Sequence, residues 1–305
     1  MRKEQIKQII KDRINEDGLI DTSIKGVKLF RVSHTHLCSP AVYEPVVVAI
    51  LSGVKEAIVD GKSYLFDSSK YLCCPISMPV EAGTPQATKE DPLLGVYISL
   101  DTKMMREITI EMESFIKGHS KESYTSSPSI AVSSWDDSFS EALFRLLSIE
   151  NDPVDTAILK ESRLRELYYT ILKGEAGKSA RRAFGVGNEI ARSIEYISKR
   201  VEQPISIEDM ADQVGMSRAV FHRKFKQATT MSPIQFVKSM RLNMGAMKLA
   251  AGMNINEAAL QVGYVSSSQF SREFKRMYGQ SPKQWSKTVT LPADIIQKNT
   301  EYIYQ

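Results

Sequence analysis

Cysteine and histidine, which build disulfide frameworks and most zinc sites, are scarce in this sequence. There are three cysteines and four histidines among 305 residues. An odd number of cysteines (Cys38, Cys73 and Cys74) without framework spacing excludes a disulfide-stapled scaffold and fits a reducing compartment. None of the three has the spacing of a zinc site. We therefore expect a fold that is held together by its hydrophobic cores.

Long hydrophobic runs are absent as well. The longest apolar stretch, residues 45–54, is far too short to span a bilayer. The basic N-terminal segment has no apolar run of the kind found in secretory signals. With 42% hydrophobic and 25% charged residues, the composition is ordinary for a globular protein. We expect a cytoplasmic protein without a membrane partner, long enough for two domains.

Acidic residues are depleted in one part of the chain. Residues 181–290 hold 17 Lys and Arg against 8 Asp and Glu, which gives +9, whereas residues 1–180 carry −4. A basic segment beside a mildly acidic remainder is typical of a nucleic-acid-binding module attached to another domain. A basic domain without a partner would carry the same charge, so charge alone does not decide.

Hydrophobic periodicity divides the chain. It predicts a helix over residues 3–16, then short β-rich runs up to about residue 100, two of them joined by the hairpin signal Asp60-Gly61. Several short strands at this spacing predict a barrel or sandwich. Further helices are expected at 102–117, 138–150 and 153–173. The expected division is an N-terminal domain (1–175), a linker containing Gly, Ser and Arg (176–188), a C-terminal helical domain (189–290) and a tail (291–305).

Two stretches, 217–236 and 266–285, have nearly the same sequence. The matched pairs include Phe221 with Phe270, Arg223 with Arg272, Phe225 with Phe274 and Lys226 with Lys275. The second copy has one extra residue between its glycine, Gly263, and the serine that opens the match. Because only two copies exist, the repeat indicates a duplicated small unit rather than a solenoid.

Each copy has the layout of a helix-turn-helix: a helix, a turn with Gly215 or Gly263, a second helix, and a Ser-Pro cap. The phenylalanines four residues apart form an apolar stripe that must face a core, which leaves the opposite face for base edges and phosphates. The predicted DNA-contacting residues are Arg218, Ala219, His222, Arg223 and Lys226 in the first copy and Ser267, Ser268, Ser271, Arg272 and Lys275 in the second.

Two alternatives stay open on these faces. Arg223 and Arg272 could equally tie their helices to the domain through salt bridges. Contacts of Arg218 and Lys226 to phosphate alone would add affinity without specificity. Between the copies, residues 232–251 predict one long helix of about 30 Å, close to the ~34 Å repeat of B-DNA. It would hold two recognition helices in successive grooves.

At these residues the chain resembles the AraC/XylS family of bacterial transcription regulators. The matching motifs are ISIEDMADQVGMS, FHRKFK, SPIQF…RLNMGAMKLA and ALQVGYVSSSQFSREFKRMYGQSPKQW. The resemblance implies a transcription regulator, most often an activator, whose partners are double-stranded DNA and RNA polymerase. One departure is Thr230, at a position where the family usually has glycine and the second copy has Gly279. The first recognition helix is therefore expected to end less cleanly.

The first 175 residues are similar, less closely, to the N-terminal domain of one branch of that family. The similar stretches are LFRVS, YEPVVVAILSGVKEAIVDGKSYLF and RELYYTILKGEAG. The resemblance implies an α+β protein: a cupin-like β-barrel followed by helices, acting as an effector-sensing and dimerisation unit. A homodimer is one expectation, and the helix over 156–172 either forms its contact or covers the barrel.

A metal site in that barrel has little support. His34 and His36 would need a nearby Glu and a third His on a later strand. Glu44 lies beyond the usual spacing, and no histidine occurs between 37 and 118. We expect no metal, no cofactor and no catalytic residue. The cysteines are interpreted as buried residues rather than redox sensors, and Cys38 differs from the other two in lying in the loop-like THLCSP.

For an unknown small-molecule effector, the residues proposed as contacts are Arg31, His36, Cys38 and Tyr43, polar or reactive groups near the expected barrel mouth. Ligand binding there would shift the population of DNA-competent arrangements. Two alternatives remain: a cupin-type enzyme fused to a DNA-binding module, or a constitutive DNA binder without effector. The effector, the operator, the sign of regulation and the role of the tail are not determined by the sequence.

Overall fold

The N-terminal half contains two antiparallel sheets that face each other. The computed structural model of the chain describes residues 2–116, 129–185 and 188–288, so the predicted tail lies outside the described residues. The larger sheet has the order β1 (Gly18–Asp21), β2 (Val27–Val32), β9 (Leu93–Ser99), β4 (Val46–Ser52), β7 (Lys70–Cys74) and β10 (Ala131–Ser134). The smaller sheet has the order β3 (His36–Tyr43), β8 (Met78–Thr84), β5 (Val54–Val59) and β6 (Lys62–Asp67).

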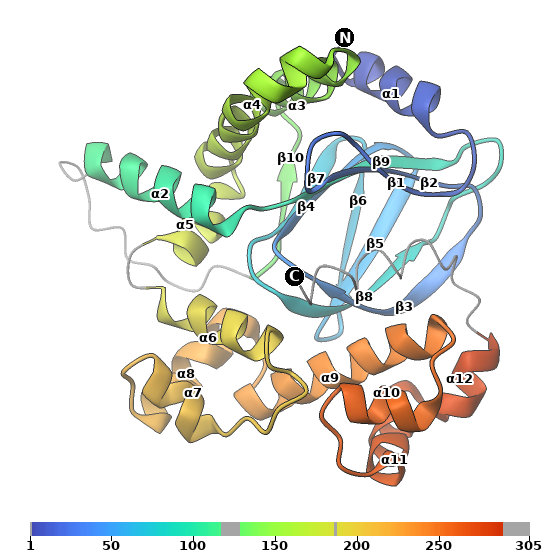
Figure 1. Cartoon of the computed structure of the whole chain (residues 1–305), viewed down its shortest axis with the longest axis vertical. Helices are drawn as coiled ribbons and strands as arrows, with labels where there is room; N and C mark the ends of the chain where they lie inside the picture. The colour runs from blue at the N-terminus through green and yellow to red at the C-terminus, as the bar shows by residue number, and fades with distance from the viewer. Residues whose placement is uncertain (1, 117–128, 186–187, 289–305) are drawn as a thin grey trace.

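The α+β fold class is confirmed, with one difference from the expected closed barrel. The strands form two separate sheets, and within the described residues β1 and β10 remain edges of the larger one. Each of these edge strands is four residues long, so each offers few backbone groups for the hydrogen bonds that would close the sheets into a barrel. Figure 1 shows the two sheets facing each other. The hairpin expected at Asp60-Gly61 joins β5 to β6, with both residues at positive φ.

The helices of the N-terminal half lie beside the larger sheet and pack largely on one another. They are α1 (Arg2–Arg13), α2 (Thr102–Ile116), α3 (Asp137–Ser148), the 3-10 turn Ile149–Asn151, α4 (Pro153–Lys173) and α5 (Gly177–Phe184). The side chain of Asp152 caps α4 and Pro153 opens it, and the helix ends at Gly174, as the sequence predicts. Only the C-terminal half of α4 is buried, through Leu167, Tyr168, Ile171 and Leu172.

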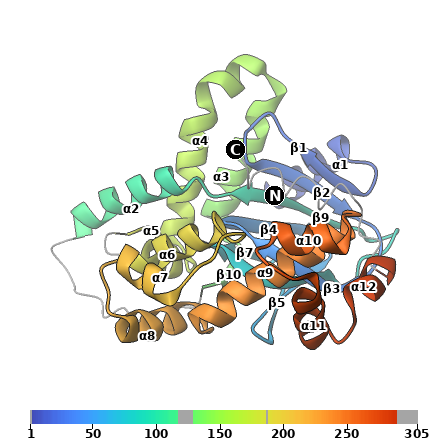
Figure 2. The same cartoon turned by 60° about the horizontal axis from the view of Figure 1, so that its bottom comes forward.

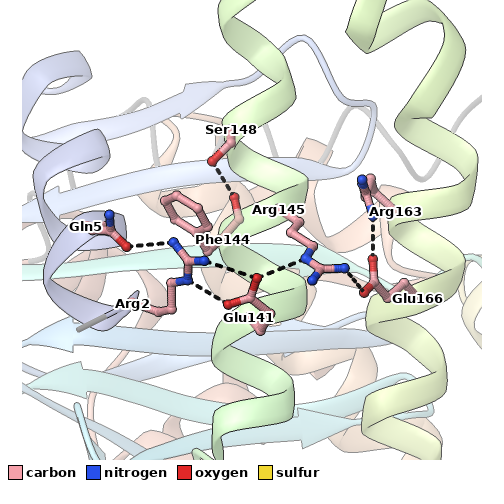
Figure 3. A network of polar contacts seen from close by, with 8 residues as sticks. All are labelled: Arg2, Gln5, Glu141, Phe144, Arg145, Ser148, Arg163 and Glu166. Carbon is pink, nitrogen blue, oxygen red and sulfur yellow. Dashed lines mark hydrogen bonds and ion pairs between the residues drawn. The ribbon is translucent and has the colours of Figure 1, made fainter.

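An alternating series of charges ties the N-terminal helix to the α3–α4 hairpin. The Arg2 guanidinium donates to Glu141 at 2.6 Å, and Glu141 also accepts from Arg145 at 2.9 Å. Arg145 also donates to Glu166 at 3.2 Å, and Glu166 accepts a second hydrogen bond from Arg163 at 2.9 Å (Figure 3). One such surface pair contributes little, but a connected network holds several side chains in a single geometry. The network thereby fixes α1 across α3 and α4.

The segment expected to be an interdomain linker is largely helical. Within 176–188, helix α5 buries Ala180, Ala183 and Phe184, which recur at helical spacing. Glycine and serine in this stretch suggested a flexible linker, but the apolar positions between them supply a face that packs against α4 and α2. The connection between the halves is therefore short and begins after Phe184.

The C-terminal half is all helical: α6 (Glu189–Ser198), α7 (Ile207–Gln213), α8 (Arg218–Thr229), α9 (Pro233–Ala250), α10 (Ile255–Gln261), α11 (Ser267–Tyr278) and α12 (Pro282–Thr288). Polar side chains cap the starts of three of these helices. Ser206 accepts from the Asp209 amide at 3.0 Å, Asn254 from the Glu257 amide at 2.9 Å, and Ser232 forms a capping box at α9.

The expectation that α8 ends less cleanly than α11 is wrong. Thr230 adopts the left-handed conformation at φ 68°, as Gly279 does at φ 74°. In both cases the amide of this residue bonds to a carbonyl four residues earlier, Lys226 or Lys275, at 2.9 Å. The two recognition helices therefore share one terminating geometry, and Thr230 adopts it at a steric cost that glycine does not have.

Candidate nucleic-acid interface and interdomain cleft

Two helix-turn-helix units lie at opposite ends of helix α9 (Figure 1). In the first unit Phe221 and Phe225 of α8 are fully buried, and Phe225 meets Phe236 of α9 edge-on at 5.3 Å between ring centroids. In the second unit Phe270 and Phe274 of α11 are equally buried. This apolar stripe orients each helix so that its other face is turned outward, as the repeat predicts.

The ten predicted DNA-contacting residues lie on these outward faces. In α8, Arg218, Ala219, His222, Arg223 and Lys226 are all exposed. In α11, Ser268, Arg272 and Lys275 are exposed, whereas Ser267 and Ser271 are half-buried. The structure thus brings each set together on one helix. Lys224, a further exposed cation on α8, is not among the residues predicted from the sequence, because that prediction counted only the residues on the face opposite the two phenylalanines.

Ion pairing on these faces differs from the alternatives that the sequence left open. Within the described residues, neither Arg223 nor Arg272 forms a hydrogen bond or ion pair. Arg218 instead pairs with Glu208 of α7 at 2.8 Å, and both side chains are well exposed. A pair this exposed is weak and exchanges readily for phosphate. Arg223 and Arg272 therefore keep their guanidinium donors available.

Glu273 is a structural carboxylate that the sequence did not reveal. It accepts from Tyr264 at 2.9 Å and pairs with Lys238 of α9 at 3.0 Å, joining α11 to the preceding turn and to the long helix. Burial opposes its ionisation, but the hydrogen bonds from Lys238, Tyr264 and Gln269 outweigh this effect, so its pKa is lowered. The repeat offered one clue to this role: the position that holds Glu273 in the second copy holds a lysine, Lys224, in the first, so the charge is reversed.

Helix α9 also connects the helix-turn-helix units to the smaller sheet. Its Asn243 is 2% exposed and donates through Nδ2 to the carbonyls of Ala41 in β3 and Val80 in β8, both at 2.8 Å. The Asn243 Oδ1 atom accepts from the Tyr278 hydroxyl of α11 at 2.6 Å. Figure 2 shows α9 running along this sheet, with α11 at its far end. One amide therefore joins both sheet strands and a recognition helix.

The four residues proposed for an effector lie on two strands, Arg31 on β2 and the other three on β3. Arg31 donates to the Asp17 carboxylate at 2.8 Å. Its side chain points to the opposite face of β2 from that of the neighbouring Phe30, whose ring lies between the sheets. Cys38 lies in strand β3 rather than in a loop, and its thiol contacts Glu56 at 3.4 Å. Burial and this contact raise the pKa of Cys38 to about 12, which disfavours the thiolate form.

His36 and Tyr43 lie at opposite ends of β3. Within the described residues, the buried Nε2 of His36 and the hydroxyl of Tyr43 have no hydrogen-bond partner. Burial and the charges of His34 and Lys55 lower the pKa of His36. Lys55, which the sequence did not single out, lies 6.0 Å from the centre of the Phe30 ring, and burial lowers its pKa to about 8.

A cleft of about 820 Å³ lies where the two halves meet. Its apolar wall includes Ile76, Leu164 and Phe184, and its polar residues include Lys160 of α4 and Arg192 of α6. Both cations are exposed and, within the described residues, form no ion pair.

At one side of the cleft, Ser77 donates to the Glu44 carboxyl and accepts from Ser198 of α6 at 3.1 Å. Burial raises the pKa of Glu44, although the Ser77 hydrogen bond and the charge of Lys199 oppose the shift. Besides Lys160 and Arg192, the lining holds charged side chains of both signs: Lys25, Arg106, Lys199, Glu44, Asp101, Glu161 and Glu195. The cleft therefore combines an apolar wall with charged groups that can orient a small molecule.

Two other features bear on the class of protein. Across the described ranges, no group of three or more His, Cys, Asp and Glu side chains is placed to hold a metal ion. None of the helices in those ranges is both long enough and apolar enough to cross a membrane.

Sequence relatives match mainly the C-terminal part. AlkR of Acinetobacter baylyi is 34% identical over 98 residues, and MtrA of Neisseria gonorrhoeae 37% over 95 residues. Each of these matches covers about a third of this chain and 32% of the relative. SoxS of Salmonella typhimurium is 30% identical over 93 residues, which cover 30% of this chain and 87% of SoxS.

Solved structures extend the similarity of fold to both halves. ToxT of Vibrio cholerae superposes with a TM-score of 0.56 over 87% of this chain and 98% of ToxT, at 14% identity. A ToxT structure with a bound unsaturated fatty acid gives a TM-score of 0.53 over 91% of this chain and 98% of ToxT, at 12% identity. At these identities the similarity shows the fold alone.

Two family patterns together cover most of the chain. Residues 210–288 match a helix-turn-helix domain, which coincides with α7–α12. Residues 23–179, half of the chain, match the AraC-type transcriptional regulator N-terminus, which spans strands β2–β10 and helices α2–α4. The chain therefore belongs to the AraC family of transcriptional regulators.

Proposed function

We propose that this protein regulates transcription by binding double-stranded DNA, with α8 and α11 in two successive major grooves. The observation that carries the proposal is the pair of exposed basic faces at the two ends of α9. At ~1.5 Å per residue, the 18 residues of α9 span about 27 Å. With the width of the flanking helices, this length suits recognition helices about one turn of B-DNA apart.

The residues on each face would have separate roles. The guanidinium groups of Arg223 and Arg272 have no partner in the part of the chain that the structure describes, and such groups are suited to bidentate contact with guanine. Arg218 and the lysines would neutralise phosphates and set the register without reading sequence. Ser268 and His222 offer shorter donors and acceptors that reach base edges only where the helix lies deep in the groove.

An effector would bind in the interdomain cleft. A ligand that contacts α4 and α6 together favours the arrangement in which both walls are in place, and so shifts the equilibrium between arrangements of the two halves. We propose an organic anion with an apolar body, because the cleft has an apolar wall and because Lys160 and Arg192, which line it, have no ion-pair partner within the described residues. ToxT, of the same fold, has been solved with an unsaturated fatty acid, which supports this class of ligand. Activation through RNA polymerase, a homodimeric state and a cytoplasmic location belong to the same proposal.

DNA sites selected from random sequence by the full-length protein will test the DNA proposal. We expect two specified blocks whose centres lie about 10–10.5 base pairs apart, because the recognition helices approach one face of the duplex. The measurement is sequencing of the bound fraction, followed by titration at two salt concentrations. A single block, or two blocks a half-integral number of turns apart, would overturn the two-groove arrangement.

Thermal unfolding in the presence of oleate will test the cleft. Binding to the folded state is expected to raise Tm by several degrees, since 100 times Kd of ligand contributes about 2.7 kcal/mol. Arg192→Glu should abolish the shift by placing a negative charge in the cleft, while the exposed Lys103→Glu on α2 should not. If His36→Phe abolishes the shift and Arg192→Glu leaves it intact, the ligand binds between the sheets instead. If oleate produces no shift in any variant, the proposed ligand class is wrong.

A further inference from the structure

The second helix-turn-helix unit is one residue longer than the first, and the structure identifies the extra residue as Val265. In both units the turn closes with the same hydrogen bond, from the Met216 amide to the Ala211 carbonyl at 3.0 Å and from the Tyr264 amide to the Ala259 carbonyl at 2.9 Å. Met216 is followed directly by the capping residue Ser217, whereas Tyr264 is followed by Val265 and only then by Ser266. The extra residue noted in the repeat is therefore Val265.

Val265 contributes nothing visible to folding. Its side chain is 97% exposed, the largest exposed fraction of any large hydrophobic residue in the described ranges. The first unit has no exposed aliphatic side chain at this point, because Met216, which precedes its capping serine, is half-buried and packs against the core. A single exposed aliphatic side chain is common on protein surfaces. The position of Val265, immediately before the recognition helix, distinguishes it from the other exposed aliphatic residues.

The surroundings of Val265 are those of a groove-facing surface. It precedes α11, whose first turn begins with Ser267 and Ser268 and contains no acidic residue. Ser266 caps that turn with a 3.4 Å hydrogen bond from the Gln269 amide, so the backbone that carries Val265 is held against the helix. In helix-turn-helix proteins the N-terminal residues of the recognition helix contact base edges. Val265 is placed to enter the groove with them.

We propose that Val265 is a specificity determinant that packs against the C5-methyl group of a thymine. The proposal rests on the proposed function, namely that α11 enters a major groove. Thymine alone among the bases presents a methyl group there, and apolar side chains recognise it by contact. The half-site read by α11 therefore prefers thymine at one position near the N-terminus of the helix, and the half-site read by α8 has no matching preference.

Replacing thymine by deoxyuridine tests the contact, because it removes only the methyl group. Full-length wild type and Val265→Ala are titrated against the selected site, with each thymine replaced in turn. The wild type should lose about 3- to 10-fold in affinity at one thymine. Val265→Ala should show the same loss on unmodified DNA and no further loss with deoxyuridine at that position. Val154→Ala, at a 68% exposed valine of α4, is the matched control and should behave as wild type.

The possible results separate failure of the Val265 inference from failure of the proposed DNA binding. If both proteins lose the same affinity at every deoxyuridine, or if Val265→Ala binds as tightly as wild type throughout, Val265 makes no methyl contact and the inference is wrong. If no specific site can be selected at all, the proposed function fails first. Unchanged thermal unfolding of Val265→Ala, expected from its exposure, excludes misfolding as the cause of any loss.

Discussion

Asn243→Asp is expected to lower the free energy of unfolding by about 3–5 kcal/mol, the largest effect we expect from a single substitution. The change replaces an amide that donates to the Ala41 and Val80 carbonyls with a carboxylate that faces the same two oxygens at 2.8 Å. Asn243 is 2% exposed, so water cannot relieve the repulsion. The contact between α9 and the smaller sheet should open, and calorimetry should show two transitions in place of one.

The Asn243→Asp defect should depend on pH. Burial among carbonyls raises the pKa of the introduced carboxyl above its unfolded value of about 3.9. The folded protein then binds more protons than the unfolded chain, so its stability falls as pH rises through the interval between the two pKa values. The loss should be complete at pH 8 and smaller at pH 5, where a protonated carboxyl can donate to one carbonyl.

Asn256→Asp is the matched control for the introduced charge. Asn256 is exposed in the first turn of α10, where a negative charge is favourable, so little or no loss of stability is expected. A single cooperative transition with an unchanged midpoint in Asn243→Asp would contradict the role given to this side chain. Equal losses in both variants would point to net charge rather than to the buried amide.

Alanine substitutions on the two recognition helices should weaken DNA binding in different halves of one site. Arg218→Ala with His222→Ala affects α8, and Ser268→Ala with Arg272→Ala affects α11. All four side chains are exposed and lie opposite the buried phenylalanines, so folding should be unaffected. At roughly 1–3 kcal/mol per base contact, and with Arg218 acting on phosphate, each pair should lose about 5-fold or more on the selected site.

Sequence preference separates the roles within these pairs. Loss of a base contact relaxes preference at one position, whereas loss of a phosphate contact weakens all sequences alike and reduces the salt slope by about one. Titration at two salt concentrations against substituted sites measures both. Lys103→Ala, an exposed cation of α2, is the control for a simple loss of charge. If neither pair alters sequence preference, α8 and α11 do not read DNA.

The helix-turn-helix units could be predicted from the sequence because their signals are local. The duplicated phenylalanines, Gly215 and Gly263, and the Ser-Pro caps each fix a backbone geometry within a few residues. The same logic gave α4 its bounds, through Pro153 and Gly174. Where the local reading failed in helix α5, packing against α2 and α4 outweighed a composition typical of linkers. At Thr230 a threonine adopts the left-handed conformation that the repeat gives to glycine.

By itself, the sequence determined that this chain carries two small helical units with basic outer faces, joined by a helix about one DNA turn long, and a β-rich domain before them. Only the tertiary structure decided what α9 rests on, which carboxylate ties α11 in place, and where the two halves leave a cleft. The physical reason is that Asn243 and Glu273 bind partners tens to hundreds of residues away in the chain, and that Arg192 shares the cleft with side chains from distant segments. Contacts of that range depend on how the domains pack, and no local pattern records them.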